Sequence, residues 1–223
     1  MTVTYVDPKD GVEPLREMKL SFPLKPVSLQ GSRRAKKKLQ AAVRGEASKV
    51  PYLYTGEVRC YFEWFLHERI RYEGVHAPDV DNIIKPILDA LSGPSGIIIN
   101  DCQVQAVDCR WIDWKSEEQR IDIVVEPSDP DEYSSKEGLV FIEIGEKLCM
   151  PLDSRLPVES QQNFVKVWME MFKRRRQLIE SGQDYYAARN ALPLGRAFHR
   201  ARLNGFKRWA VDRYRARLAE SCE

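Results

Sequence analysis

The sequence predicts an α/β (α+β) fold, in which a mixed β-sheet and its helices follow one another in β-α-β-α-β-β order before a mostly helical C-terminal region. Two observations support this prediction. Several short segments alternate between apolar and polar residues, which is the period of a half-buried strand. Between them, apolar residues recur every three to four positions, which is the period of an amphipathic helix. This order of segments is typical of helices packed on a sheet.

The predicted strands have two kinds of pattern. Residues 18–24 and 58–66 alternate between apolar and polar side chains, as expected when one face of a sheet is buried. Residues 96–99, Gly-Ile-Ile-Ile, form an uninterrupted apolar run that is typical of a short buried strand, and a turn is expected at Asn100-Asp101. The remaining strands are expected over residues 104–111 and 121–126.

Two helices are expected between these strands. Ser32 can cap the first, which has an apolar stripe formed by Ala35, Leu39, Ala42 and Val43. The same helix carries a basic cluster formed by Arg33, Arg34, Lys36, Lys37 and Lys38. The second helix covers residues 82–91, with Asp81 or the residue before it as the cap. Pro86 lies close enough to its start to cost little hydrogen bonding.

Composition divides the chain into three parts. Residues 1–130 hold the predicted sheet and its helices, and residues 131–158 are expected to be a linker with one possible strand at 139–144. Residues 159–223 are expected to form a basic helical region, with one helix that ends near Ser181-Gly182 and a last helix over residues 203–218. Its aromatic residues fall on the apolar stripes, which favours core packing over stacking on nucleic-acid bases.

The charge of the chain is unevenly distributed. Its 223 residues have a net charge of +2, yet residues 155–223 hold 15 Lys and Arg against 7 Asp and Glu. That basic part suits a polyanionic partner, although solvated helical faces would have the same composition. The sequence has no apolar run long enough for a membrane span and no secretory signal, so we expect a cytoplasmic protein with no membrane partner. Its five scattered cysteines are expected to be reduced.

The candidate active site is the segment Pro-Asp-Val-Asp-Asn-Ile-Ile-Lys at residues 78–85. Asp79 and Asp81 point to the same side of an extended chain, because side chains alternate along it. Lys85 lies four residues after Asp81, one helical turn further on. Asp101 follows the apolar run, which can return the chain beside the first two carboxylates. Helix capping would explain an Asp-x-Asp pair but explains neither Lys85 nor Asp101.

Three carboxylates and a lysine suit phosphodiester hydrolysis. Adjacent carboxylates repel one another unless a cation compensates, and Mg²⁺ prefers oxygen ligands of this kind. A metal held by Asp79, Asp81 and Asp101 polarises a phosphodiester and lowers the pKa of a bound water. Lys85 can hold the attacking water or neutralise phosphate charge. The basic cluster at residues 33–38 would then contact the phosphate backbone, although it can also be a solvated face.

The pattern Asp-x-Asp-Asn-x-x-Lys, a helical Asp-Ala-Leu, and an apolar run ending in Asp-x-Gln-Val resembles the RusA family of Holliday-junction resolvases over residues 17–126. The resemblance implies that Asp79, Asp81 and Asp101 are the catalytic, metal-binding aspartates and that Lys85 is the catalytic lysine. It gives Asn82 and Asp89 supporting roles, although an ion pair with Lys85 explains Asp89 equally well. It further implies a homodimeric endodeoxyribonuclease that cuts branched DNA with Mg²⁺, for which Mn²⁺ is a possible substitute.

Two departures from the family leave alternatives open. The family usually has two consecutive acids where this chain has Asn100 and Asp101, and residues 139–223 have no recognisable counterpart. The first alternative is a nuclease retargeted to another DNA or RNA structure, in a defence or mobile-element system. The second is an inert nucleic-acid-binding or assembly protein whose C-terminal region binds a protein partner.

Overall fold

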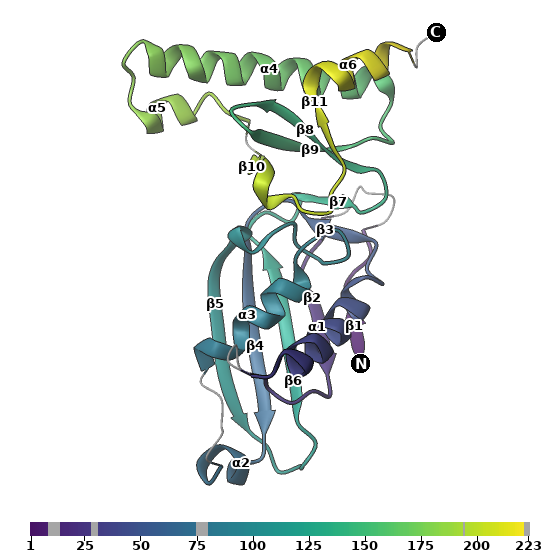
Figure 1. Ribbon diagram of the computed structural model, residues 1–223, viewed down its shortest axis with the longest axis vertical. Helices are drawn as coiled ribbons and strands as arrows, with labels where there is room; N and C mark the ends of the chain where they lie inside the picture. Colours follow the sequence, from purple (N-terminus) through teal and green to yellow (C-terminus); the bar gives the residue numbers. More distant parts are fainter. Residues whose placement is uncertain (9–13, 28–30, 75–79, 194, 221–223) are drawn as a thin grey trace. The chain divides into compact units, whose positions relative to one another are not determined.

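The computed structural model describes residues 1–8, 14–27, 31–74, 80–193 and 195–220, with the side chain of Asp81 also outside the description. The chain forms two compact units, Met1–Tyr133 and Ser134–Glu223 (Figure 1). The first contains the candidate site. No helix in the described part of the chain is both long and apolar enough to cross a membrane.

The first unit is built on a five-stranded sheet with the order β1-β2-β6-β4-β5. Its strands are β1 (Thr2–Thr4), β2 (Met18–Phe22), β4 (Val58–Leu66), β5 (Val104–Asp113) and β6 (Arg120–Pro127). β4 and β5 run parallel, and the other neighbours run antiparallel. The predicted mixed sheet is therefore confirmed. A short strand β3 (Tyr52–Tyr54) pairs separately with β7 (Tyr133–Ser135).

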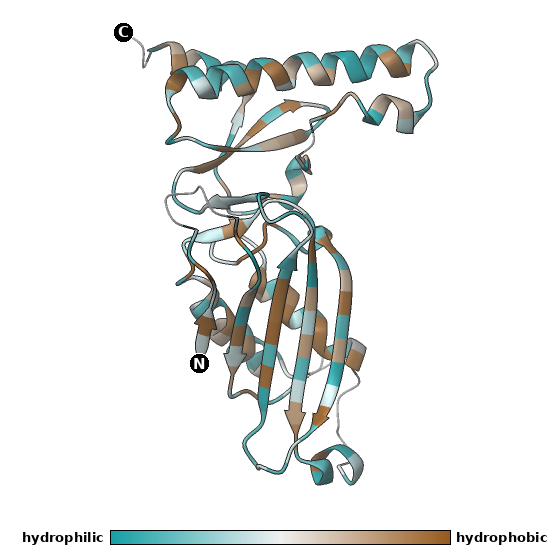
Figure 2. Cartoon of the chain, turned by 180° about the vertical axis from the view of Figure 1, so that it is seen from behind, coloured by the Kyte–Doolittle hydropathy of each residue, from teal (hydrophilic) through white to brown (hydrophobic). Residues whose placement is uncertain are grey.

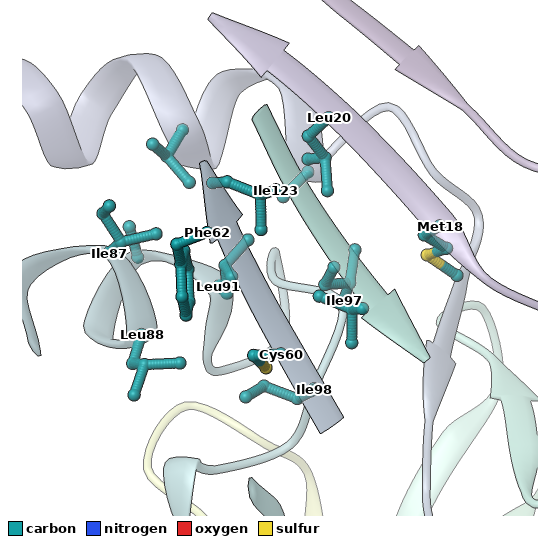
Figure 3. Close-up of a cluster of buried hydrophobic side chains, with 14 of the residues drawn as sticks. Met18, Leu20, Cys60, Phe62, Ile87, Leu88, Leu91, Ile97, Ile98 and Ile123 are labelled. Atoms are coloured by element: carbon teal, nitrogen blue, oxygen red, sulfur yellow. The ribbon is translucent and has the colours of Figure 1, made fainter. Parts of the chain in front are cut away.

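Two helices, α1 (Arg33–Ala47) and α3 (Val80–Leu91), cover one face of this sheet (Figure 1). The Ser32 side chain accepts a hydrogen bond from the amide of Ala35, so the predicted cap of α1 is confirmed. Apolar residues of the helices and of the strands meet in one core, which Figure 3 shows around Phe62, Ile87 and Ile123. Full burial of side chains of this size stabilises the fold by about 1.5–3 kcal/mol each.

The opposite face of the sheet carries no helix from the described residues of this unit (Figure 2). Its side chains pair with one another across the strands. Ser21 donates to Asp122 at 2.6 Å, and Tyr61 donates to Glu126 at 3.0 Å. Arg120 lies 4.0 Å from the ring centroid of Phe65. The alternation of β4 thus separates a buried apolar face from a polar one.

The apolar run at residues 96–99 is buried but is not a strand of the sheet. Ile98 makes only isolated bridges, to Tyr54 and to Ser92. The run follows α3 directly, and the amides of Ile97 and Ile98 bond to the carbonyl of Leu91 at the helix end. The predicted strand was therefore wrong in type, because these backbone groups are satisfied by the helix end instead of by a ladder. α3 itself begins at Val80 and continues through Pro86.

The second unit has a four-stranded sheet with the order β10-β9-β8-β11. Its strands are β8 (Leu139–Gly145), β9 (Leu148–Asp153), β10 (Phe198–His199) and β11 (Arg208–Ala210). Its helices are α4 (Val158–Glu180), α5 (Tyr185–Arg189) and α6 (Val211–Glu220). Apolar residues of α4, α6, β8 and β9 form a separate core that includes Trp168 and Phe172, as the apolar stripes predict.

Two expectations for this part of the chain differ from the structure. Residues 131–158 were expected to be a linker with one possible strand at 139–144; β8 confirms that strand, but β7 and β9 also form within the expected linker. The last helix, expected over residues 203–218, begins only at Val211. Gly205 has a φ of +84°, which ends any helical path there, and Arg208–Ala210 pair with β8 as a strand. Phe206 packs edge-on against Phe141. Its spacing from Leu203 and Ala210 in the sequence matches a helical stripe, although these residues do not form a helix.

Candidate active site

Lys85 lies between two carboxylates on the side of α3. Its Nζ is 2.5 Å from Oδ2 of Asp101 and 2.7 Å from Oδ1 of Asp89. Asp89 is one turn further along the same helix, whereas Asp101 comes from the short helix η2 (Asp101–Gln103) before β5. The structure therefore brings together three of the residues that the sequence singled out.

The two carboxylates keep Lys85 charged. Hydrogen bonds to Asp101 and to Asp89 raise the pKa of Lys85 above its ordinary value of 10.5, against a smaller opposing effect of burial. About half of the Lys85 side chain is exposed. An exposed ammonium that stays protonated at neutral pH can neutralise anionic charge or donate hydrogen bonds, and it cannot act as a general base.

Asp101 is held by a turn that its neighbours cap. Asn100 is the N-cap of η2, and its side chain accepts a hydrogen bond from the amide of Cys102 at 3.1 Å. The Gln103 side chain accepts in return from the amide of Asn100 at 3.0 Å. The Asn100 side chain also accepts from the amide of Gln103, and the reciprocal bonds between Asn100 and Gln103 form a capping box. Asn100 thus has a structural role that an asparagine performs as well as an acid does.

Gln103 also ties this turn to the sheet. Its side chain is fully buried and accepts a second hydrogen bond, at 2.6 Å, from the amide of Ile99. Its amide donates to the carbonyls of Tyr54 at 3.0 Å and of Gly56 at 2.5 Å, between β3 and β4. The sequence assigned no role to Gln103, although the Asp-x-Gln-Val pattern contained it. A polar residue beside an apolar run was the available signal.

The other two predicted metal ligands, Asp79 and Asp81, are not fully covered by the structure. Asp79 is outside the described residues, and Asp81 is the second residue of α3, with its side chain outside the described part. Asn82 is half-buried in the first turn of the same helix. Among the side chains that are described, no three His, Cys, Asp or Glu residues form a group that could hold a metal ion. The metal-binding roles of Asp79, Asp81 and Asp101 remain predictions.

The basic cluster lies at the start of α1, which packs beside α3 (Figure 1). Its exposed members are Arg33, Arg34, Lys37 and Lys38, while Lys36 is half-buried. Near the other end of α1, Arg44 donates to the backbone carbonyl of Asp89 at 3.3 Å. The helix that carries Lys85 therefore has a strongly basic helix as its direct neighbour.

The region that contains this site was compared with known proteins. Residues 27–126 match the family model of the endodeoxyribonuclease RusA. The RusA match contains Lys85, Asp89, Asp101 and Gln103, and it confirms the resemblance seen in the motif, although it starts later than residue 17. It lies entirely within the first unit. Comparison with curated proteins gives no match.

Proposed function

We propose that this protein is a metal-dependent endonuclease that hydrolyses DNA phosphodiester bonds, with Holliday junctions or other branched DNA as its substrate. The observation that carries the proposal is the Lys85–Asp101 pair at 2.5 Å within the segment that matches RusA. A match to an endodeoxyribonuclease family supports DNA cleavage. A charged lysine paired with a carboxylate is what such chemistry requires beside a phosphate.

Asp101, together with Asp79 and Asp81, would hold Mg²⁺, with Mn²⁺ as a possible substitute. The donor set fits, because hard divalent cations take carboxylate oxygens and one third of the Asp101 side chain is exposed. When bound, the metal would polarise the phosphodiester and lower the pKa of a water molecule. Asp101 also accepts a hydrogen bond from Lys85, which would orient its carboxylate toward the metal.

Lys85 would place positive charge next to the phosphate that is cut. Its two carboxylate partners orient the ammonium and keep it protonated, so we assign it charge stabilisation and hydrogen-bond donation. Asp89 would act as a positioning residue that holds the ammonium of Lys85 from one helical turn further along α3. Asn82 lies one residue after Asp81, and we assign it a supporting role at the start of α3.

We infer the substrate and the assembly from the RusA resemblance. Symmetric cutting of a four-way junction requires two active sites, so we propose a homodimer. The basic cluster at residues 33–38 would contact the phosphate backbone beside the site. A protein partner could bind through the second unit. The recombination and repair of DNA in the cytoplasm would be the setting.

One cleavage assay tests the chemistry. Purified protein is incubated with a four-way junction, a plain duplex and single-stranded DNA and RNA, each with Mg²⁺, Mn²⁺ or EDTA. We expect Mg²⁺-dependent cleavage of the junction and its loss in Asp81→Asn, with DNA binding retained. Cleavage by Asp81→Asn at the wild-type rate would overturn the mechanism. Preferential cutting of another substrate would support retargeting, and no cutting of any substrate would support an inert binding protein.

A further inference from the structure

Four exposed cations of the second unit lie close together along α4 and the neighbouring α6. Lys166, Lys173 and Arg174 lie on the exposed side of α4, and Arg215 lies on α6. None of them forms an ion pair with another residue in the described part of the chain. Other cations of this unit do: Arg175 bonds to Glu146 at 2.5 Å, and Arg155 bonds to Asp153 at 2.6 Å. The charges of the first group are therefore not used in ion pairs within the described part of the chain.

The unpaired cations line two adjoining hollows along α4. The larger, of about 580 Å³, lies between α4 and α6 and is lined by Lys166, Arg215 and the amide side chains of Gln162 and Asn163. The smaller, of about 320 Å³, is lined by Lys173 and Arg174. Glu170 lines both hollows, so they adjoin at this residue. We refer to the two hollows together as the α4 groove.

The α4 groove has the length of a short stretch of nucleic acid. It extends from Gln162 to Gln177, which corresponds to about 22 Å along a helix with a rise of 1.5 Å per residue. Phosphates of one DNA strand are spaced about 3.4 Å apart along the helix axis, so the groove covers about six of them. Its cations come in two groups about 11 Å apart, separated by one carboxylate.

We propose that the α4 groove binds the phosphate backbone of DNA and gives the nuclease a second DNA contact outside its active site. This inference rests on the proposed function only for the kind of nucleic acid. Lysine and arginine supply the charge, and the exposed amide of Asn163 can donate to phosphate oxygens. A second contact on the same chain raises the effective concentration of DNA at the first.

The charge spacing favours a regular polyanion over an acidic protein segment. An acidic protein segment would also need an exposed apolar surface to pack against. The large apolar residues that line the groove, Met169 and Met171, are half-buried. Glu170 lies between the two cationic groups and opposes any anion there. Glu170 therefore tests whether the ligand is an anion, because removal of its negative charge should strengthen the binding of DNA.

The test measures binding without cleavage. DNA affinity of the full-length Asp101→Asn protein is measured by fluorescence anisotropy, in EDTA, for a four-way junction at several salt concentrations. We expect Lys166→Gln/Arg215→Gln to weaken binding roughly tenfold and to lower the magnitude of the salt slope by about two, as for two lost phosphate contacts. Glu170→Gln should tighten binding. Unchanged thermal unfolding of each variant excludes misfolding as the cause.

A matched control separates a defined groove from general charge. Arg213 is an exposed cation of α6 that lines neither hollow, so Arg213→Gln removes a similar charge from the same unit. We expect its effect to be clearly smaller. Arg215→Gln alone is its matched partner, because each variant removes one exposed arginine of α6. An equal loss in Arg213→Gln and Arg215→Gln, or no loss in the double variant, would overturn the proposal. Because no metal is present, the result is independent of whether the protein cleaves DNA.

Discussion

The side-chain amide of Gln103 donates a hydrogen bond of 3.0 Å to the backbone carbonyl of Tyr54, 49 residues earlier in the chain. This bond joins the turn that carries Asp101 to the segment that leads into β4, an interior strand that pairs with both β5 and β6. Asp101 lies two residues before Gln103 and contacts Lys85 on α3. The position of the candidate carboxylate thus depends on a buried amide that touches neither DNA nor metal.

Replacement of Gln103 by leucine should impair both stability and cleavage. Leucine has a similar volume but leaves four backbone groups without their partner: the amides of Ile99 and Asn100 and the carbonyls of Tyr54 and Gly56. Each buried group left unpaired costs about 1–3 kcal/mol. We expect the free energy of unfolding to fall by at least about 3 kcal/mol, as measured by urea denaturation.

The control for this change is Gln105→Leu, which makes the same substitution at an exposed position of β5. Its stability should change by less than about 0.5 kcal/mol. Gln103→Glu provides the second comparison, because it keeps the acceptor but faces two carbonyls with a carboxylate. If Gln103→Glu cleaves junctions at the wild-type kcat, Gln103 does not position Asp101.

Lys85→Met should lower kcat for DNA cleavage by about a hundredfold or more, because the transition state loses the positive charge and the hydrogen bonds of the ammonium. The affinity for DNA should change little, because the basic cluster of α1 is unaffected. Lys85→Arg keeps the charge and should restore part of the activity. Single-turnover cleavage of a junction measures all three proteins. A Lys85→Met protein with an unchanged rate would remove Lys85 from the mechanism.

Glu146→Gln should destabilise the second unit. Glu146 is the partner of Arg175, whose side chain is only 9% exposed, and neutralising it leaves a nearly buried guanidinium without a counter-charge. We expect a loss of about 2 kcal/mol in the free energy of unfolding. Glu143→Gln is the matched control, because its partner Arg200 is 48% exposed and the pair is worth at most about 1 kcal/mol. Equal losses in the two variants would contradict this account.

The buried thiols should resist alkylation. Burial raises the pKa of Cys60 to about 12 and that of Cys149 to about 11, from an ordinary value of 9.0. The folded protein therefore keeps thiol protons that the unfolded chain loses above about pH 9, and this contribution to stability declines as the pH rises from there. With iodoacetamide at pH 8, we expect both residues to react only in denaturant, as measured by peptide mass spectrometry. Rapid labelling of native Cys60 would be inconsistent with its position in the core.

Periodicity predicted β2, β4, β5, β6 and the two covering helices, but it missed β1 (Thr2–Thr4), which is too short to show a period. β4 was predicted over residues 58–66, the range that it occupies, because its alternation continues over nine residues. Prediction failed where a buried apolar segment had no period of its own, as at residues 96–99. It also failed at Leu203, Phe206 and Ala210, whose spacing matches a helix although Gly205 interrupts one. Long-range strand pairing cannot be recognised from local spacing.

For the candidate site, the sequence predicted that Lys85 and Asp89 could form an ion pair, but it did not predict the hydrogen bonds of Gln103 that hold the turn at Asp101. The distance from Lys85 to Asp89 follows from helical spacing, whereas its contact with Asp101 depends on how residues 92–100 return to α3. The two hydrogen bonds that Gln103 donates reach residues 49 and 47 positions away, so no local pattern contains them. The roles of Asp79 and Asp81 stay predictions.

The parallel pairing of β11 with β8 means that the sheet of the second unit can be completed only late in translation. Phe141 lies opposite Arg208, so one edge of β8 has no neighbour until residues 208–210 have left the ribosome. An unpaired, largely apolar strand edge invites pairing with other chains. Nascent or prematurely terminated chains would expose this edge, and aggregation during expression should therefore increase when translation stops before Arg208.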